Sequence, residues 1–304
     1  MQHGLAGIEI CIVRATGPSH LRCAGVLWMA HAVRRARAVP AKRIDSYVAM
    51  SGGMSGGTVR SGIVGDTRHA HKLSDPFLLG GEPAQGPTAA DADPDAAEYE
   101  PTVSSWVAPF GMARINTRVV RRSVGLLRAR AAGGEPAGEE PGSALFDAEF
   151  RYSERALAPS EGAAKKAARA VAAPLEVRER LVKEGRLPRP GEGPSAEERA
   201  QGWFAMHFVG EPAADGHDRV RGTVSGGDPG YDETAKMVSE AAVMLATQRG
   251  ALAERGGVHT PASAFGLRLQ RRLHDSGISF VLDDGATPDK SAAPHARAAP
   301  ASKL

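Results

Sequence analysis

Periodic patterns of apolar residues along the chain predict a mixture of strands and helices. Apolar residues at helical spacing predict helices over residues 21–38, 59–71, 113–132, 234–248 and 260–274. Short apolar or alternating runs predict strands over residues 8–13, 44–50, 146–153, 202–210, 218–225 and 278–282. A short polar connection joins the fourth and fifth of these strands, which favours antiparallel pairing. The pattern predicts an α+β fold, an antiparallel mixed sheet with packed helices.

The composition divides the chain into one long domain with loosely packed inserts. Its 304 residues include 36 glycines and 21 prolines, and only 5% are aromatic. Segments with few apolar residues predict mobile inserts near 81–98, 133–142 and 156–186. We therefore expect a residual strand and loop over 1–20, one domain over 21–283, and a disordered tail over 284–304.

Charge and cysteine content exclude several classes of function. The formal net charge is only +3, and the arginine clusters have no interleaved aromatic residues. We expect these clusters to form solvated helix faces, not a nucleic-acid site; they are Arg34, Arg35 and Arg37, and Arg118, Arg121 and Arg122. The two cysteines, Cys11 and Cys23, provide neither a zinc ligand set nor a disulfide framework, which fits a reducing compartment. No metal site is predicted.

A glycine-rich loop follows the predicted strand 44–50 and precedes a predicted helix. Backbone N–H groups converge at such a helix start, and glycines let a ligand approach the backbone. One interpretation is a loop that borders a cofactor or substrate site and holds an anionic group, with Thr58 as a helix cap. The alternative is a tight turn that needs glycine for geometry alone. The candidate residues are Ser51, Gly52, Gly53, Ser55, Gly56, Gly57 and Thr58.

A second strand–turn–helix segment near the N-terminus lacks the features of a dinucleotide site. The dinucleotide fingerprint requires three glycines after the strand, and only Gly17 is present. Arg14 and His20 stand where glycines would be needed, and Pro18 has no N–H to donate. We predict that the chain alone binds no dinucleotide tightly.

Four short motifs occur in a fixed order along the chain: SGGMSGGTVRSG at 51–62, PGEGPS at 190–195, GDPGYDETAKM at 227–237 and GGVHTPA at 256–262. Together they resemble the motifs of the saccharopine dehydrogenase-like oxidoreductases, a family that includes the trans-acting enoyl reductases. VLWMAH at 26–31 also fits, so the resemblance covers roughly residues 18–282.

The resemblance implies the substrate domain of a Rossmann-type dehydrogenase that lacks most of its N-terminal dinucleotide-binding domain. It implies an oxidoreductase of lipid or glycolipid metabolism that uses NAD(P) on a small-molecule or lipid-linked substrate. The alternative is a non-catalytic remnant, a binding or dimerisation module that binds no cofactor. A homo-oligomer is compatible with both, and catalytic residues cannot be assigned from spacing.

The last three residues, Ser302, Lys303 and Leu304, match a peroxisomal address. They predict delivery by the peroxisomal import receptor to the peroxisome or a related organelle such as the glycosome. The alternative location is the cytoplasm or a lipid surface.

Overall fold

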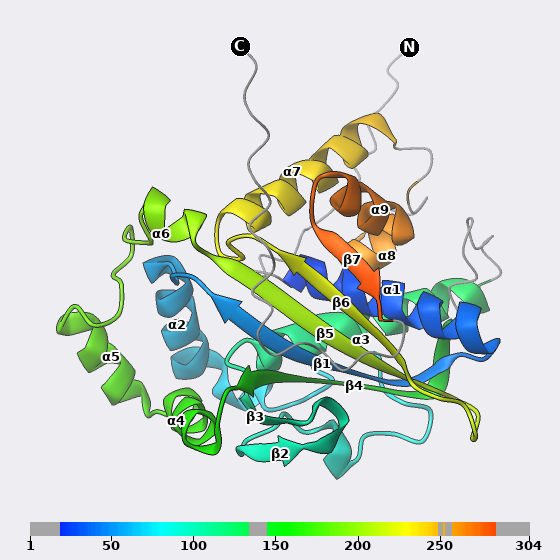
Figure 1. Cartoon of the computed structure of the whole chain (residues 1–304), viewed down its shortest axis with the longest axis horizontal. Helices are drawn as coiled ribbons and strands as arrows, with labels where there is room; N and C mark the ends of the chain where they lie inside the picture. Colours follow the sequence, from blue (N-terminus) through cyan, green and yellow to red (C-terminus); the bar gives the residue numbers. More distant parts are fainter. Residues whose placement is uncertain (1–18, 134–144, 249–251, 253–256, 284–304) are drawn as a thin grey trace.

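The computed structural model describes residues 19–133, 145–248, 252 and 257–283 (Figure 1). The predicted strand 8–13, the Arg14–Gly17 segment, most of the linker 133–142 and the tail with Ser302, Lys303 and Leu304 lie outside these residues. Within the described ranges, no helix combines the length and apolar composition needed to cross a bilayer.

A seven-stranded sheet organises the described part of the chain, in the order β2-β3-β4-β1-β5-β6-β7. Strand β1 pairs in parallel with β4 and antiparallel with β5, and the other neighbours are antiparallel. The predicted α+β class with a mixed sheet is therefore confirmed. The strands are β1 (Ala41–Ser51), β2 (Glu98–Glu100), β3 (Ser105–Pro109), β4 (Phe146–Ala158), β5 (Trp203–Pro212), β6 (Val220–Gly226) and β7 (Ser279–Leu282).

The main hydrophobic core lies between one face of this sheet and several helices. Helix α1 (Ser19–Arg37) packs on β1, β5 and β6, and α3 (Ala113–Ala132) packs on α1 and β4. Helices α7 (Asp232–Thr247), α8 (Pro261–Phe265) and α9 (Leu267–Asp275) complete this layer. The remaining helices are α2 (Gly56–Leu73), α4 (Glu161–Val171), α5 (Leu175–Lys183) and α6 (Ala196–Ala200).

The opposite face of the central strands is packed by a short segment of chain and a small apolar cluster. In Figure 1 the front of β1, β5 and β6 carries no helix in the part of the chain that the structure describes. A smaller apolar cluster lies on this side, formed by Tyr47, Val103, Val107 and Val209. The short segment 98–103 supplies Val103 and is fixed there by the Arg221 guanidinium, which donates to the Thr102 carbonyl at 2.8 Å. The sheet is thus packed by helices on one side only.

Two predicted boundaries differ from the structure. The strand predicted over 146–153 continues to Ala158, and residues from the predicted insert 156–186 form α4 and α5. The helix predicted over 260–274 is two helices, because Gly266 adopts φ 59° and breaks the hydrogen-bond ladder between α8 and α9. Whether the domain is a remnant of a Rossmann-type dehydrogenase stays a prediction.

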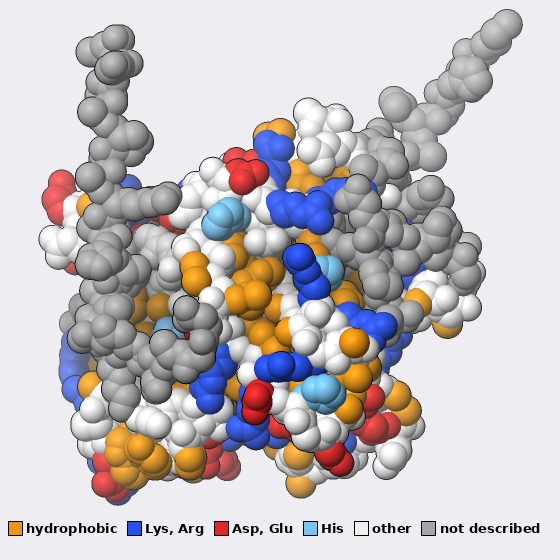
Figure 2. Space-filling view, turned by 45° about the vertical axis from the view of Figure 1, so that its right-hand side comes forward, with side chains coloured by type: hydrophobic (Ala, Val, Ile, Leu, Met, Phe, Trp, Pro, Cys, Tyr) orange, Lys and Arg blue, Asp and Glu red, His pale blue; other side chains and the backbone are white. Residues whose placement is uncertain are grey.

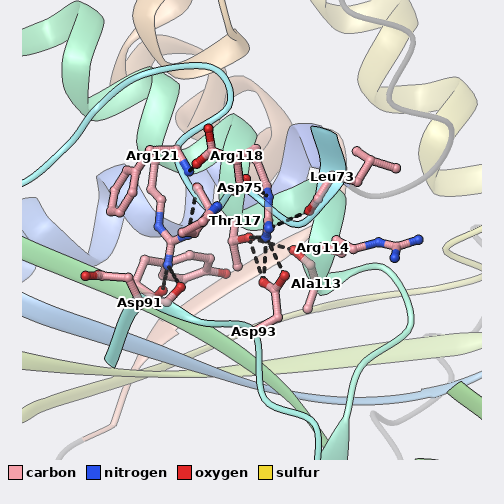
Figure 3. Close-up of polar contacts among 12 residues, drawn as sticks. Leu73, Asp75, Asp91, Asp93, Ala113, Arg114, Thr117, Arg118 and Arg121 are labelled. Carbon is pink, nitrogen blue, oxygen red and sulfur yellow. Dashed lines mark hydrogen bonds and ion pairs between the residues drawn. The ribbon is translucent and has the colours of Figure 1, made fainter. Parts of the chain in front are cut away.

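The expectation that Arg118 and Arg121 form a solvated helix face is wrong. Their side chains are 2% and 4% exposed, and they lie between α3 and the segment 73–93 (Figure 3). Arg118 donates to both carboxylate oxygens of Asp93 at 2.6 Å and to the carbonyls of Asp75 and Leu73. A guanidinium has five N–H donors, so one side chain can bind several carbonyls of an irregular segment.

Arg121 binds the same segment one helical turn further along α3. It donates to the carbonyls of Pro76 at 2.8 Å and Asp91 at 2.9 Å, and its guanidinium stacks on the Phe77 ring. Asp91 is itself buried and forms an ion pair with Arg151 of β4. The segment 81–98, which composition alone predicts to be a mobile insert, therefore contains a buried side chain that binds the sheet.

A buried ion pair lies inside the main core. Arg22 of α1 and Glu154 of β4 are 1% and 0% exposed, and they are in direct contact. Asn116 of α3 donates to the second Glu154 oxygen at 2.9 Å, and the Phe110 ring covers the Arg22 guanidinium. Burial raises the pKa of the nearby Tyr152 hydroxyl, an effect that the positive charge of Arg22 opposes. The pair connects α1, α3 and the sheet.

We predict that Arg22→Met lowers the free energy of unfolding by about 3–5 kcal/mol, because it leaves the Glu154 charge buried without a cation. The double variant Arg22→Met/Glu154→Met removes both charges at similar volume and should recover most of this loss. Urea unfolding followed by circular dichroism measures both.

The control is Lys165→Met, which removes an exposed ion pair with Glu161 and should change stability by less than about 0.5 kcal/mol. If Arg22→Met is as stable as Lys165→Met, the buried ion pair does not stabilise the core as we infer.

Candidate functional site

The glycine loop connects the end of β1 to the start of α2. The prediction of Thr58 as the helix cap is wrong: Ser55 is the N-cap, and its Oγ accepts a hydrogen bond from the Thr58 N–H at 3.0 Å. The two hydroxyls of Ser55 and Thr58 also lie 2.9 Å apart. The capping residue is earlier than predicted because the helix begins at Gly56, inside the glycine run.

Three of the four sequence motifs meet at this loop. The Gly56 N–H donates to the Glu192 carbonyl at 3.0 Å, and Gly53 lies against Pro194. On the other side, Gly52 faces Asp228, and Gly230 lies close to the Gly53 carbonyl. Segments near residues 51–58, 190–195 and 227–231 therefore form one junction beside the end of β1. We call it the glycine junction.

The described part of the fourth motif lies elsewhere. Thr260 caps α8, and its Oγ1 lies 2.7 Å from the Ser123 Oγ of α3, inside the main core. The side chains of Thr260 and Ser263 form a hydrogen bond with each other, and each also accepts one from the backbone N–H of the other residue. Within residues 257–262, this motif stabilises a helix start and is not part of the glycine junction.

Close packing at one position and backbone conformation at the other explain why Gly56 and Gly52 are required at the junction. A Cβ on Gly56 would lie 1.7 Å from the Arg189 carbonyl oxygen, a distance that no folded protein tolerates. Gly52 adopts φ 145°, which side-chain-bearing residues rarely adopt. Gly57, in contrast, is exposed, and a Cβ on it would lie 3.6 Å from the Ser55 Oγ, an ordinary contact. The turn interpretation of the loop thus accounts for Gly52 and Gly56.

The junction does not match a cradle for the pyrophosphate of a dinucleotide. An anion at a helix start needs several backbone N–H groups that have no other partner. At α2 the Gly56 and Thr58 N–H groups already donate within the protein. The Asp228 carboxylate, directly beneath Gly52, would also repel a phosphate.

Asp228 is the most unusual polar residue of the junction. Its side chain is 1% exposed, and its Oδ2 accepts hydrogen bonds from the Tyr231 and Asp232 N–H groups at 2.6 and 3.3 Å. These bonds satisfy backbone donors at the start of α7, which is a structural role in forming the turn before the helix. Its second oxygen, Oδ1, has no hydrogen-bond partner. The sequence offered no signal for that unpaired oxygen.

A second group of polar side chains lies on the opposite face of the sheet. His207 of β5 is the register partner of both Tyr47 and Thr223, and its Nδ1 lies 3.0 Å from the Thr223 Oγ1. Burial lowers the pKa of His207, so the imidazole is neutral at pH 7. The strand alternation places His207 on this face, but nothing in its sequence context distinguishes it as functional.

Metal-ligating side chains do not gather anywhere in the described part of the chain. Within residues 19–133, 145–248, 252 and 257–283, no cluster of His, Cys, Asp or Glu side chains could hold a metal ion. The thiol of Cys23 is buried in the core, which raises its pKa to about 11. At neutral pH this cysteine is a protonated, inert thiol.

We predict different outcomes for alanine at two neighbouring glycines. Gly56→Ala should lower the free energy of unfolding by at least about 3 kcal/mol, because its methyl group collides with the Arg189 backbone. Gly57 lies in the first turn of α2, where an alanine methyl group meets no clash. Gly57→Ala should therefore leave the free energy of unfolding unchanged or raise it by about 0.5–1 kcal/mol. Thermal unfolding distinguishes them, and equal melting temperatures would contradict the close packing at Gly56.

Comparison with known proteins shows which ones the chain is similar to. A protein of Mycobacterium tuberculosis H37Rv named as a trans-acting enoyl reductase is 30% identical over 251 residues, which cover 75% of this chain and 56% of that protein. The trans-acting enoyl reductase of Mycobacterium bovis BCG is 29% identical over 228 residues, which cover 68% of this chain and 49% of that protein. The protein of the same name from Mycobacterium leprae is 27% identical over 227 residues.

The matched region spans about half the length of these curated relatives. No family model matches the sequence. No solved structure matches the chain at a significant level. The chain is thus related in sequence to the mycobacterial proteins named trans-acting enoyl reductase.

Proposed function

We propose that the chain is an oxidoreductase that reduces the double bond of an enoyl group. The observation that carries this proposal is the 30% identity, over three quarters of the chain, with a protein named as a trans-acting enoyl reductase. The glycine junction supports it, because three motifs far apart in the sequence meet at one place. A lipid-linked or small enoyl compound is the proposed substrate class, in keeping with the expected role in lipid or glycolipid metabolism.

The proposed reaction needs a hydride donor and a proton donor. A nicotinamide cofactor, NADH or NADPH, would supply the hydride to the β carbon, and a proton would be added to the α carbon. The glycine junction does not fit the cofactor's pyrophosphate, since two N–H groups of its helix start are used internally and a carboxylate, that of Asp228, lies beside Gly52. We therefore propose that the junction contacts the substrate.

Oxidation of NADH and of NADPH, followed at 340 nm with a crotonyl thioester and a longer trans-2-enoyl thioester, tests the proposal. We expect enoyl-dependent oxidation that saturates only above about 100 μM cofactor, because no described loop forms a pyrophosphate cradle. Fluorescence titration with each cofactor measures binding directly. No enoyl-dependent oxidation at millimolar cofactor would contradict the enzymatic function, and micromolar cofactor binding would contradict the account of the loop.

The second candidate function is a binding or dimerisation module without catalysis. The partly uncovered sheet face favours it, because exposed apolar side chains on a strand at the sheet edge often mark an interface. Val281 of the edge strand β7 is 53% exposed and, by strand alternation, lies on the face opposite the buried Phe280. Figure 2, which brings forward the side of the molecule that carries β7 and α9, shows apolar side chains among basic ones.

If two copies pair through this face, sedimentation at micromolar concentration should show a dimer. Val281→Asp should shift it towards monomer, because the new charge would be buried at the contact. The control Val171→Asp changes a similarly exposed valine, 44% exposed on α4. A monomer at all concentrations, or equal effects of the two variants, would contradict dimerisation through β7.

A further inference from the structure

We propose that the sheet face opposite the helices binds the acyl group of the substrate, and that the Nε2–H group of His207 donates a hydrogen bond to its carbonyl oxygen. The inference rests on the proposed function for the nature of the substrate, an enoyl thioester of the kind used in the 340 nm assay. It adds the place where the acyl group binds and the residue that holds its reacting carbonyl.

His207 lies inside the sheet, on a face that helices leave open. It is the register partner of Tyr47 on β1 and of Thr223 on β6, so its strand has a neighbour on each side. The residues before and after it, Met206 and Phe208, belong to the main core, which places His207 on the other face. In the part of the chain that the structure describes, no helix covers β1, β5 and β6 there (Figure 1). The side chain is partly exposed, so a ligand can reach it.

The imidazole is held by one neighbour and keeps its second nitrogen available. Its Nδ1 lies 3.0 Å from the Thr223 Oγ1. The Thr223 hydroxyl can donate its proton to Nδ1, and the neutral ring then carries its own proton on Nε2. Nε2 has no hydrogen-bond partner among the described residues, and it is not one of the buried atoms that lack a partner. The ring therefore presents a fixed donor to an acceptor atom of a ligand.

The donor is uncharged, and so is its surrounding surface. Burial lowers the pKa of His207, so the ring is neutral at pH 7. Two cations on the same face have partners: Arg221 donates to the Thr102 carbonyl at 2.8 Å, and Arg155 pairs with Glu98 at 2.8 Å. A neutral imidazole can polarise a carbonyl by donating to its oxygen. The position thus favours an uncharged carbonyl compound over an anion.

The side chains around His207 suit an acyl chain. In the next row of the sheet the register partners Ala49, Ala205 and Ser225 are short, so the imidazole extends further from the sheet than they do. In the same row as His207, Val281 of the edge strand is 53% exposed. Binding sites for small molecules typically combine such apolar surface with a few polar groups that fix the orientation. An enoyl thioester matches this surface, because it has one carbonyl acceptor on an apolar chain.

The same face leads to the glycine junction. Strand β5 begins there at Trp203, which is the register partner of Ser51. Trp203, Ala205 and His207 share one face, and four residues of a strand span roughly 13 Å. A thioester whose carbonyl lies at His207 can therefore extend along β5 to the junction, which agrees with a junction that contacts the substrate.

A hydrogen bond to the carbonyl oxygen would assist the proposed reduction. Addition of a hydride, with its electron pair, from a dihydronicotinamide to the β carbon moves the π electrons of the double bond onto the carbonyl oxygen. An enolate forms, and the hydride donor is left as the oxidised nicotinamide. The bond from Nε2–H strengthens as the negative charge develops on the oxygen. The enolate then reforms its carbonyl and takes a proton from water at the α carbon, so His207 stabilises charge and loses no proton.

NMR of the full chain labelled with ¹⁵N-histidine tests binding without turnover. The probe is crotonyl-pantetheine without cofactor, and the control is the crotyl thioether of pantetheine, which has no carbonyl. We expect the free chain to carry the His207 proton on Nε2. The thioester, and not the thioether, should shift the Nε2 signal. The variant His207→Gln identifies this signal among those of the ten histidines.

His207→Leu removes the donor, and we expect it to weaken binding of crotonyl-pantetheine about tenfold. In the 340 nm assay its kcat should fall about 10²- to 10³-fold, with a smaller rise in KM. His207→Gln keeps an N–H donor and should recover part of both losses. The control His69→Leu changes an exposed histidine of α2 and should leave binding and kcat unchanged. Thermal unfolding checks that each variant is folded.

Several results would overturn this inference. They are a proton on Nδ1 instead of Nε2 in the free chain, no shift with the thioester, equal shifts with thioester and thioether, or a folded His207→Leu variant that binds as tightly as the wild type. A chain that reduces the thioester equally well without His207 refutes this inference and leaves the proposed function in place. A chain that binds the thioester through His207 but oxidises no cofactor refutes enoyl reduction and leaves the site in place.

Discussion

The buried ion pair of Arg22 and Glu154 is the interaction on which the packing of helices against the sheet depends. A charge enclosed in a core is tolerated only when an opposite charge and further hydrogen bonds are present. Here the cation comes from α1, the anion from β4, and the additional donor, Asn116, from α3. Three elements that are distant in the sequence must therefore be correctly placed at once for this part of the core to be stable.

The same principle operates outside the main core, with backbone carbonyls as the partners. Arg118 and Arg121 project from the buried side of α3 and bind carbonyls of the irregular segment 73–93. Beyond the buried Phe77 ring the segment is irregular, so these bonds hold the backbone of a connection that no α-helix or strand ladder holds in place. Polar interactions thus help to position this segment, including the residues from 81 onwards whose composition predicts a mobile insert.

At the glycine junction, backbone contact is the governing constraint. Gly56 lies against the Arg189 carbonyl, and Gly52 and Gly202 surround Asp228, so the loops approach more closely than side chains would allow. This packing keeps a carboxylate buried at the start of α7 with one oxygen unpaired.

The sequence by itself determined which segments are helices and which are strands, because apolar residues repeat every 3.6 residues on the buried face of a helix and every two residues on that of a strand. It also determined the glycine loop and the motifs that relate the chain to the enoyl reductases. Only the tertiary structure decided which motifs meet. The described part of the fourth motif caps a helix in the core, and the first three form the junction. Nor could local sequence show that Arg118 and Arg121 are buried or that Asp228 has a free oxygen. Burial and hydrogen-bond partners depend on residues far away along the chain, and no periodic pattern records them.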